Sequence, residues 1–431
     1  MREMSRHFGG STAVSPRDGG RRARPRVLFL SCHLPYPPIS GGRRRELELI
    51  RRIGADFDVH LVVVSKTPSE DIANVDALRL FCSDVEVFSA EEVRARGTRA
   101  QLPLAVARHR CPAATRRIAQ LLACGRVDLV HVEGFYLIQH VPEWSTVPLL
   151  LVEQNVEYEL ERQTAVAASA HDLETLDVTA RTRTAEQASW RRATLLGAIT
   201  REDRETILEA VPEADVRVIP DGADHVHAAQ ERPAAAAPEH PGGPLLVFVG
   251  NFAYAPNVDA AVYLCESILP RIHERLPDVH VWLVGNAPPR ELCSLESSRV
   301  WVTGTVPDVV PYTKLAEVVV CPLRIGGGIK VKTIEALSCG KALVTTPIGA
   351  QGLPPAARAA LVIAGEASAF AEATLHVLLD PERRHALERD ARRAAGSLPT
   401  WDDAAGALGC TYDELARSRG GLHFARAGGS A

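Results

Sequence analysis

Long apolar runs are missing from this 431-residue chain. No run reaches the ~18 residues that a membrane-spanning helix needs, and the arginine-, glycine- and serine-rich segment 1–25 lacks the hydrophobic centre of a secretory signal. We therefore expect a cytoplasmic protein that neither spans a membrane nor is secreted. Segment 1–25 is predicted to be disordered, and weak peripheral contact of its arginines with an anionic membrane is the alternative.

Paired cysteines and a strong net charge are also missing. The nine cysteines are scattered and never form a C-x-x-C pair, which argues against a disulfide framework and against a zinc site. A net charge of −4 gives no support to nucleic-acid binding. Asp56 and Asp58 imitate a D-x-D metal motif, but they precede a predicted strand, which favours a turn. We expect no metal site, no cofactor and no nucleic-acid partner.

Lysine is scarce, since only five of the 49 lysine and arginine residues are lysines. Three of the five lie in segment 321–346, which is typical of a strand end, a glycine-rich loop, a short helix and another strand. Glycines let a backbone approach a ligand closely, and the free N–H groups at a helix start point at an anion. This segment predicts a phosphate site whose candidate residues are Arg324, Gly327, Gly328, Lys330 and Lys332.

Short β-branched runs alternate with amphipathic segments in two series, which is the pattern of βαβ units with parallel sheets. We predict strands of the first series at 26–31, 59–64, 84–88, 127–132, 147–152 and 216–219. Strands of the second series are predicted at 245–250, 279–284, 300–303, 318–320, 342–345 and 361–363. Segment 227–243, rich in proline and alanine, has the composition of a linker. The sequence therefore predicts an α/β fold of two domains, 26–226 and 244–396, with a ligand cleft at the carboxyl ends of both sheets.

Several motifs, taken in order, resemble a known family. They are Pro-Tyr-Pro-Pro-Ile-Ser-Gly-Gly at 35–42, Val-Ile-Pro-Asp-Gly at 218–222, Leu-Val-Phe-Val-Gly at 246–250, and the late glycine-rich loop with its helix. Over residues 26–415 the chain resembles the family-4 glycosyltransferases, or glycosyl transferases group 1. A Pro-Asn-Val-Asp loop at 256–259 and a G-x-G-I-x-x-K-x-x-E helix resemble one branch of that family. The resemblance implies a GT-B fold, in which two Rossmann-like domains face each other across a cleft, and a crossover helix at 397–418 that packs back on the first domain.

The resemblance also implies a donor-binding site. Glu335 would hold a nucleotide ribose, because a carboxylate about one and a half turns into a helix can reach a diol beside the phosphates. An exposed pair with Lys332 is the alternative for Glu335. Gly41 and Gly42 precede another predicted helix start, with a plain tight turn as the alternative. Asn251 follows the first strand of the second domain, in a loop that lacks the cations common in the family.

The acceptor side is expected in the first domain. His131 and Glu133 end a predicted strand, so we expect both side chains to emerge near the cleft as catalytic candidates that take the acceptor proton. Buried strand-end polarity is the alternative for His131, and Glu133 stands where much of the family has a histidine. Asn155 and Glu157 belong to a segment similar to the H-N-V-E signature of one branch, and would shape the acceptor side. An N-cap at Asn155 explains part of this pattern without any function.

Together, the residues and the resemblance predict a metal-independent hexosyl- or other glycosyltransferase. It would move a sugar from a nucleotide-diphosphate donor to a hydroxyl of a small-molecule, glycan or lipid-linked acceptor, and the resemblance implies retention of anomeric configuration. A nucleotide-sugar epimerase of the same fold and a catalytically inactive nucleotide-binding scaffold are the alternatives. A Rossmann oxidoreductase is disfavoured, because no G-x-G-x-x-G follows either opening strand.

Overall fold

The structure is a computed structural model that describes residues 24–91, 102–167, 173–225 and 238–427. The predicted disordered segment 1–25 lies almost entirely outside the described residues, and so does most of the predicted linker 227–243. Within the described ranges, no helix is both long and apolar enough to cross a membrane.

A fully parallel sheet forms the first domain, with its strands in the order β3-β2-β1-β4-β5-β6-β7. The central strands are rich in valine and leucine and are buried on both faces, as expected for a parallel sheet that helices cover on each side. The strands are β1 (Arg26–Ser31), β2 (Asp58–Ser65), β3 (Asp84–Ser89), β4 (Leu129–Glu133), β5 (Leu149–Glu153), β6 (Leu195–Ala198) and β7 (Val216–Val218).

Helices follow most of these strands and return the chain to the start of the sheet. They are α1 (Gly41–Ile53), α2 (Pro68–Ile72), α3 (Leu104–Arg108), α4 (Pro112–Ala123), α5 (Glu157–Ala167), α6 (Leu173–Arg192) and α7 (Arg201–Ala210), with short 3-10 turns η1 (Val75–Ala77) and η3 (Phe135–His140). The first of them, α1, starts cleanly because Ser40 has extended backbone and its hydroxyl accepts the N–H of Arg43.

The second domain repeats this design with the strand order β10-β9-β8-β11-β12-β13. Its strands are β8 (Leu245–Val249), β9 (His280–Val284), β10 (Val300–Val302), β11 (Val318–Cys321), β12 (Leu343–Thr345) and β13 (Val362–Ile363). Its helices are α9 (Ala255–Tyr263), the π-helical η4 (Leu264–Ile268), α10 (Leu269–His273), α11 (Arg290–Cys293), α12 (Val310–Leu315), α13 (Val331–Ser338), α14 (Pro355–Ala359), α15 (Ala367–Leu379) and α16 (Pro381–Ala395).

Both sheets confirm the predicted α/β fold of two Rossmann-like domains. The prediction missed one strand, β6, whose sequence Leu-Leu-Gly-Ala has four residues and no β-branched side chain. Tertiary packing explains its conformation, since β6 pairs with β5 and β7 and a Cβ atom at Gly197 would lie 2.9 Å from Val152 Cγ2.

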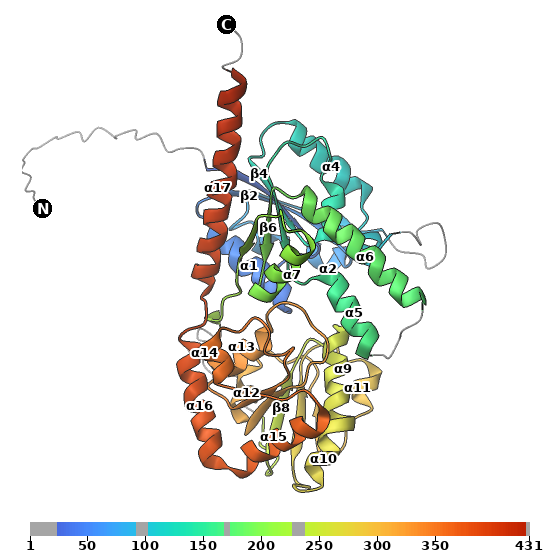
Figure 1. Ribbon diagram of the computed structural model, residues 1–431, viewed down its shortest axis with the longest axis vertical. Helices are drawn as coiled ribbons and strands as arrows, with labels where there is room; N and C mark the ends of the chain where they lie inside the picture. Colours follow the sequence, from blue (N-terminus) through green and yellow to red (C-terminus); the bar gives the residue numbers. More distant parts are fainter. Residues whose placement is uncertain (1–23, 92–101, 168–172, 226–237, 428–431) are drawn as a thin grey trace, which may run out of the picture.

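The last helix, α17 (Trp401–Ala427), leaves the second domain and runs along the first (Figure 1). Trp401, Leu408 and Tyr412 are buried in the same core cluster as β1, β2 and α1. The helix extends beyond residue 418, where the predicted crossover segment ends. Asp224 Oδ1 accepts the N–H of Trp401 at 2.7 Å and so ties the helix start to the end of the first domain.

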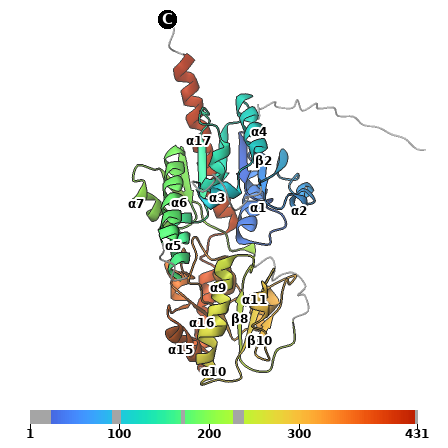
Figure 2. The same cartoon turned by 90° about the vertical axis from the view of Figure 1, so that its right-hand side faces the viewer.

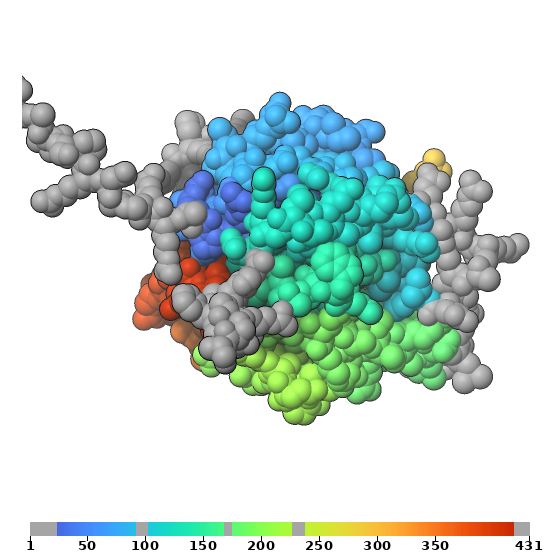
Figure 3. Space-filling view, turned by 90° about the horizontal axis from the view of Figure 1, so that it is seen from above, coloured from blue at the N-terminus to red at the C-terminus, as the bar shows by residue number. Residues whose placement is uncertain are grey.

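The two domains lie one above the other, and α5 reaches from the first toward α9 of the second (Figures 1 and 2). Seen from above, the first domain fills the view and C-terminal residues appear at its edge (Figure 3). The segments that follow β1, β5, β8 and β11 meet between the domains, as the contacts below show. This places the site where parallel sheets carry their ligands, at the carboxyl ends of the strands.

Candidate active site

Two helix starts face each other across the domain boundary. Helix α1 begins at Gly41, and α13 begins at Val331. A Cβ atom at Gly41 would lie 3.4 Å from Val331 Cγ2, so the two starts are in contact distance. Because each helix carries unpaired N–H groups and partial positive charge at its start, this junction is favourable for an anion.

The glycine-rich loop before α13 packs directly on the first domain. Gly326 donates its N–H to Gln163 Oε1 at 2.9 Å. Gly328 has a φ of +61°, and a Cβ atom there would lie 2.5 Å from the Gln154 carbonyl oxygen. In the amide orientation that gives its nitrogen hydrogen-bond acceptors, Asn155 Nδ2 donates to the carbonyl oxygens of Gln154 and Gly327, both at 3.1 Å. The loop therefore needs glycine because its backbone packs closely on the first domain. This reason is separate from the close approach to a ligand that the sequence predicted.

Lys330 holds the shape of this loop. Its ammonium donates to the carbonyl oxygens of Gly327 at 2.8 Å and Gly328 at 2.7 Å. The side chain is buried, and burial lowers the pKa of Lys330 to about 8, an effect that nearby Asp203 partly opposes. The predicted contact of Lys330 with a phosphate stays a prediction, and it requires the ammonium to exchange a carbonyl partner for the ligand.

The other two predicted cations also have partners within the second domain. Arg324 forms a bidentate ion pair with Asp259 and lies 4.5 Å from the centroid of the Tyr263 ring. The Lys332 ammonium donates to Asn257 Oδ1, and burial lowers its pKa. Both cations are thus held against α9, and an incoming phosphate competes with these partners.

Asn251 orders the loop after β8. Its side-chain oxygen accepts the N–H of Ala253 at 3.1 Å, and its carbonyl oxygen accepts from Asn257 Nδ2 at 2.7 Å. Because Asn257 also accepts from Lys332, the loop after β8 and helix α13 are connected through a single amide side chain.

Glu335 contacts a residue that the sequence did not single out. His225 Nε2 lies 3.2 Å from Glu335 Oε1, and Trp401 Nε1 donates to His225 Nδ1 at 3.2 Å. The indole N–H can only donate, so His225 Nδ1 is the acceptor. His225 Nε2 therefore carries the proton and donates the hydrogen bond to Glu335. Glu335, the residue predicted to bind the ribose, is therefore connected through His225 to the start of α17. The alternative pair of Glu335 with Lys332 is not the contact seen.

His131 and Glu133 do not emerge at the cleft, so that expectation is wrong. They are 0% and 1% exposed, because α1 and α17 cover the end of β4. His131 stacks on Phe29 and contacts Tyr412 Oη at 2.6 Å and Glu133 Oε1 at 2.9 Å. Burial raises the pKa of Glu133, but the contacts with His131 and the charge of Arg45 lower it by more. The pKa of Glu133 therefore lies below the ordinary value of a glutamate. A catalytic role for either residue stays a prediction, and these contacts favour a positioning role.

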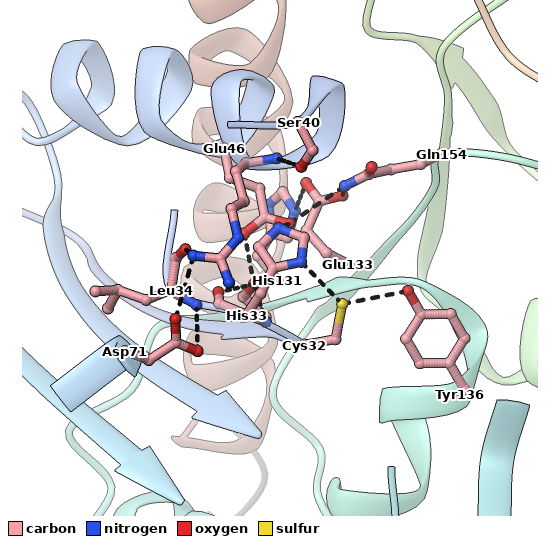
Figure 4. Close-up of polar contacts among 12 residues, drawn as sticks. Cys32, His33, Leu34, Ser40, Glu46, Asp71, His131, Glu133, Tyr136 and Gln154 are labelled. Carbon is pink, nitrogen blue, oxygen red and sulfur yellow. Dashed lines mark hydrogen bonds and ion pairs between the residues drawn. The ribbon is translucent and has the colours of Figure 1, made fainter. Parts of the chain in front are cut away.

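A polar network extends from Glu133 toward the first loop (Figure 4). Gln154 Nε2 donates to Glu133 Oε2 at 3.0 Å and to Glu46 Oε1 at 3.2 Å. A Cβ atom at Gly42 would lie 2.7 Å from Gln154 Oε1, which explains glycine at this position. Ser31 Oγ donates to Glu46 Oε2 at 2.5 Å. Glu46 was not among the predicted site residues. The polar residues that follow the strand 26–31 are the signal in the sequence that could have indicated this network.

The segment predicted to shape the acceptor side begins its helix in a different way from the one expected. The N–H groups of Glu157 and Tyr158 donate to the Glu186 carboxylate at 2.8 and 3.0 Å, so a side chain of α6 caps the start of α5. The expected N-cap at Asn155 is wrong, because its amide faces the glycine-rich loop. Burial raises the pKa of Glu157 to about 7, with a further contribution from Glu161.

Residues 243–380 match the family model described as Glycosyl transferases group 1. The matched range covers most of the second domain. The match includes the glycine-rich loop, Lys330, Lys332 and Glu335, whereas the predicted donor-side residues Gly41 and Gly42 lie outside it. No curated protein sequence matches the chain significantly.

Solved glycosyltransferase structures share the fold over almost the whole chain. Sucrose-phosphate synthase from Thermosynechococcus elongatus is 17% identical with a TM-score of 0.65, covering 92% of this chain and 100% of that one. HepE of Anabaena, in complex with UDP and glucose, is 14% identical with a TM-score of 0.60, covering 90% and 99%. The α,α-trehalose-phosphate synthase (UDP-forming) from Burkholderia vietnamiensis is 13% identical with a TM-score of 0.60, covering 91% and 100%. These similarities confirm the predicted GT-B fold.

The contact between the glycine-rich loop and the first domain predicts the effect of Gly328→Ala. The added methyl group meets the Gln154 carbonyl and forces the domains apart, in addition to the ~1–2 kcal/mol of left-handed strain. Gly304→Ala is the matched control, because Gly304 has a φ of +67° and open space around its Cα. We expect Gly328→Ala to lower the melting temperature more than Gly304→Ala and to raise the radius of gyration in X-ray scattering. Equal effects of the two substitutions would contradict a tight domain contact.

Proposed function

We propose that this protein transfers a sugar from a nucleotide-diphosphate donor to a hydroxyl acceptor. The observation that carries the proposal is the glycosyl transferases group 1 domain at 243–380, whose helix α13 starts against the start of α1. Two opposed helix starts provide N–H donors and positive potential for a pyrophosphate, the group that leaves with the nucleotide in such a transfer.

The donor would lie along α13. The pyrophosphate would occupy the junction between Gly41 and Val331, and the Glu335 carboxylate would accept hydrogen bonds from a ribose diol. Lys330 would then turn from the loop carbonyls to the phosphate, for which its lowered pKa leaves it charged below about pH 8. The complex of HepE with UDP and glucose supports a nucleotide-sugar donor. Metal independence is part of the proposal, because helix starts and cations would meet the phosphate charge.

The acceptor would lie against α5 in the first domain. Glu157 is half-buried at the start of α5 and close enough to Cys32 and Lys66 for their charges to affect its pKa. A carboxylate whose pKa is about 7 is well matched to take a proton at neutral pH. We propose Glu157 as the group that receives the acceptor proton, with Glu133 as a positioning residue that orients Gln154. Retention of configuration, with a donor phosphate oxygen as the competing base, is the stereochemistry that the family resemblance favours.

Glu335→Ala should weaken the binding of nucleoside diphosphates. Loss of a charge-assisted hydrogen bond of ~1.5–3 kcal/mol corresponds to an about 10- to 150-fold higher Kd by titration calorimetry. Glu291→Ala, at an exposed glutamate of α11 outside the site, is the matched control and should bind like the wild type. Unchanged affinity in Glu335→Ala would rule out the ribose assignment.

Turnover should require both a donor and an acceptor. A panel of nucleotide sugars is first screened for thermal stabilisation, since a ligand that binds the folded state raises its melting temperature. The stabilising donor is then incubated with and without a panel of hydroxyl acceptors, and nucleotide release is measured. We expect release only with an acceptor. Isomerisation of the donor without an acceptor would indicate an epimerase, and binding without any turnover would indicate a scaffold.

Glu157→Gln should lower turnover by about 10²–10⁴-fold without changing donor affinity. Because burial raises the pKa of Glu157 to about 7, the ionised base forms as the pH rises, and wild-type turnover should increase through about pH 7. The substitution should flatten this limb of the pH profile. Glu159→Gln on the same helix is the control, since Glu159 pairs with Arg162 instead. Wild-type turnover and pH profile in Glu157→Gln would leave the donor phosphate as the base.

A further inference from the structure

A cysteine and a histidine in the loop after β1 form a relay with a carboxylate of α1 (Figure 4). Cys32 Sγ lies 3.3 Å from His33 Nδ1, and His33 Nε2 lies 3.1 Å from Glu46 Oε1. Ser31 and Gln154 hold the Glu46 carboxylate from the other side. A nucleophile next to a base, with the base held by a third group, is the arrangement that activates thiols in proteins.

A second group of side chains converges on the same sulfur. Tyr136 Oη donates to Cys32 Sγ at 3.6 Å, and the Tyr136 ring stacks on His109 at a centroid distance of 4.2 Å. His109 is 4% exposed, and its Nδ1 contacts the Ala105 carbonyl at 2.7 Å. Its Nε2 has no hydrogen-bond partner among the described residues. This buried imidazole lies next to the half-buried thiol, and its interaction with Cys32 lowers the pKa of the thiol.

Positive and negative groups both surround the sulfur, and the two histidines act on it most strongly. Burial raises the pKa of the Cys32 thiol, but His33 and His109 together lower it more, to well below the ordinary value. Burial lowers the pKa of His33, but Glu46 and Cys32 raise it well above the ordinary value. Lys66, directly after β2, adds positive charge near the sulfur, and Glu157 from α5 adds negative charge. Both shifts favour a thiolate beside an imidazolium in this pair.

We propose that Cys32 is a reactive thiolate that exchanges with low-molecular-weight disulfides. The Cys32 sulfur attacks one sulfur of the disulfide R–S–S–R, a new S–S bond forms, and the old S–S bond breaks. The electron pair leaves with the thiolate RS⁻, which takes a proton from water. A second molecule of thiol reverses the reaction by the same steps, so the modification is reversible and consumes no other oxidant.

A mixed disulfide at Cys32 would lie on the acceptor side of the cleft. Cys32 is half-buried, and it is close enough to Glu157 at the start of α5 for their charges to interact. If the proposed function holds, the adduct excludes the acceptor, and turnover falls until a thiol removes it. This last consequence rests on the proposed function, whereas the reactivity of Cys32 does not.

The reactivity is tested on the full-length protein with oxidised glutathione and, separately, with iodoacetamide at pH 6, followed by peptide mass spectrometry. The exposed cysteines Cys124, Cys293 and Cys410 serve as internal references in the same digest. We expect Cys32 to react about 10-fold faster or more, because an ordinary thiol carries little thiolate at this pH. Rates at Cys32 equal to or below those of the exposed cysteines would overturn the proposal.

Substitutions identify the activating groups. His33→Asn and, separately, His109→Gln should each slow labelling of Cys32 at pH 6 and shift its pH profile upward, while His60→Asn on β2 is the matched control outside the cleft. Circular dichroism checks that each variant is folded. Unchanged labelling in both cleft variants would overturn the relay.

Turnover of the donor is measured before and after formation of the mixed disulfide. Loss of turnover with the adduct, restored by a thiol, supports the proposal that a group on Cys32 excludes the acceptor. Fast labelling in a protein that turns over no donor supports the thiolate and contradicts the proposed function.

Discussion

The close packing of residues 326–328 on Gln154 and Asn155 is the contact on which the rest of the site depends. Gly328 has a left-handed backbone, and its Cα lies so near the Gln154 carbonyl that a methyl group would not fit. This approach brings the start of α13 to the start of α1 and sets the distance between two positive helix ends. Any larger side chain in the loop would separate the two ends and weaken the positive potential between them.

Charge within the site is balanced by the protein itself. Lys330 donates to carbonyl oxygens of its own loop, Arg324 pairs with Asp259, and Lys332 donates to Asn257. Desolvated cations need such partners, because an unpaired buried charge is costly. A phosphate ligand would therefore bind by exchanging these partners, so its affinity is the difference between two sets of charge-assisted contacts rather than the sum of new ones.

Helix α17 contacts both sides of the site through hydrogen-bond relays. Trp401 reaches Glu335, the predicted ribose-binding residue, through His225. Tyr412 reaches Glu133 in the first domain through His131. Because one helix holds both relays, the orientation of the two domains and the orientation of these two carboxylates are coupled. The same helix buries the end of β4, which explains why Glu133 lies within a network and not at the cleft surface.

The sequence by itself determined the fold class and the order of the elements. Alternating β-branched runs and the glycine-rich segment before α13 are local patterns, and the secondary structure they favour agrees with the packing. Strand β6 was not predicted, because four residues without a β-branched side chain form a strand only by pairing with neighbouring strands.

Contacts between distant residues were decided only by the tertiary structure. Glu186 caps α5 from α6, Asn155 faces the second domain, and His225 joins Glu335 to α17. Whether a strand-end side chain such as Glu133 is exposed depends on which helices cover it, and this is a property of the assembled domains. Local propensity carries no information on such long-range partners, because they arise from burial and from the need to satisfy each buried polar group.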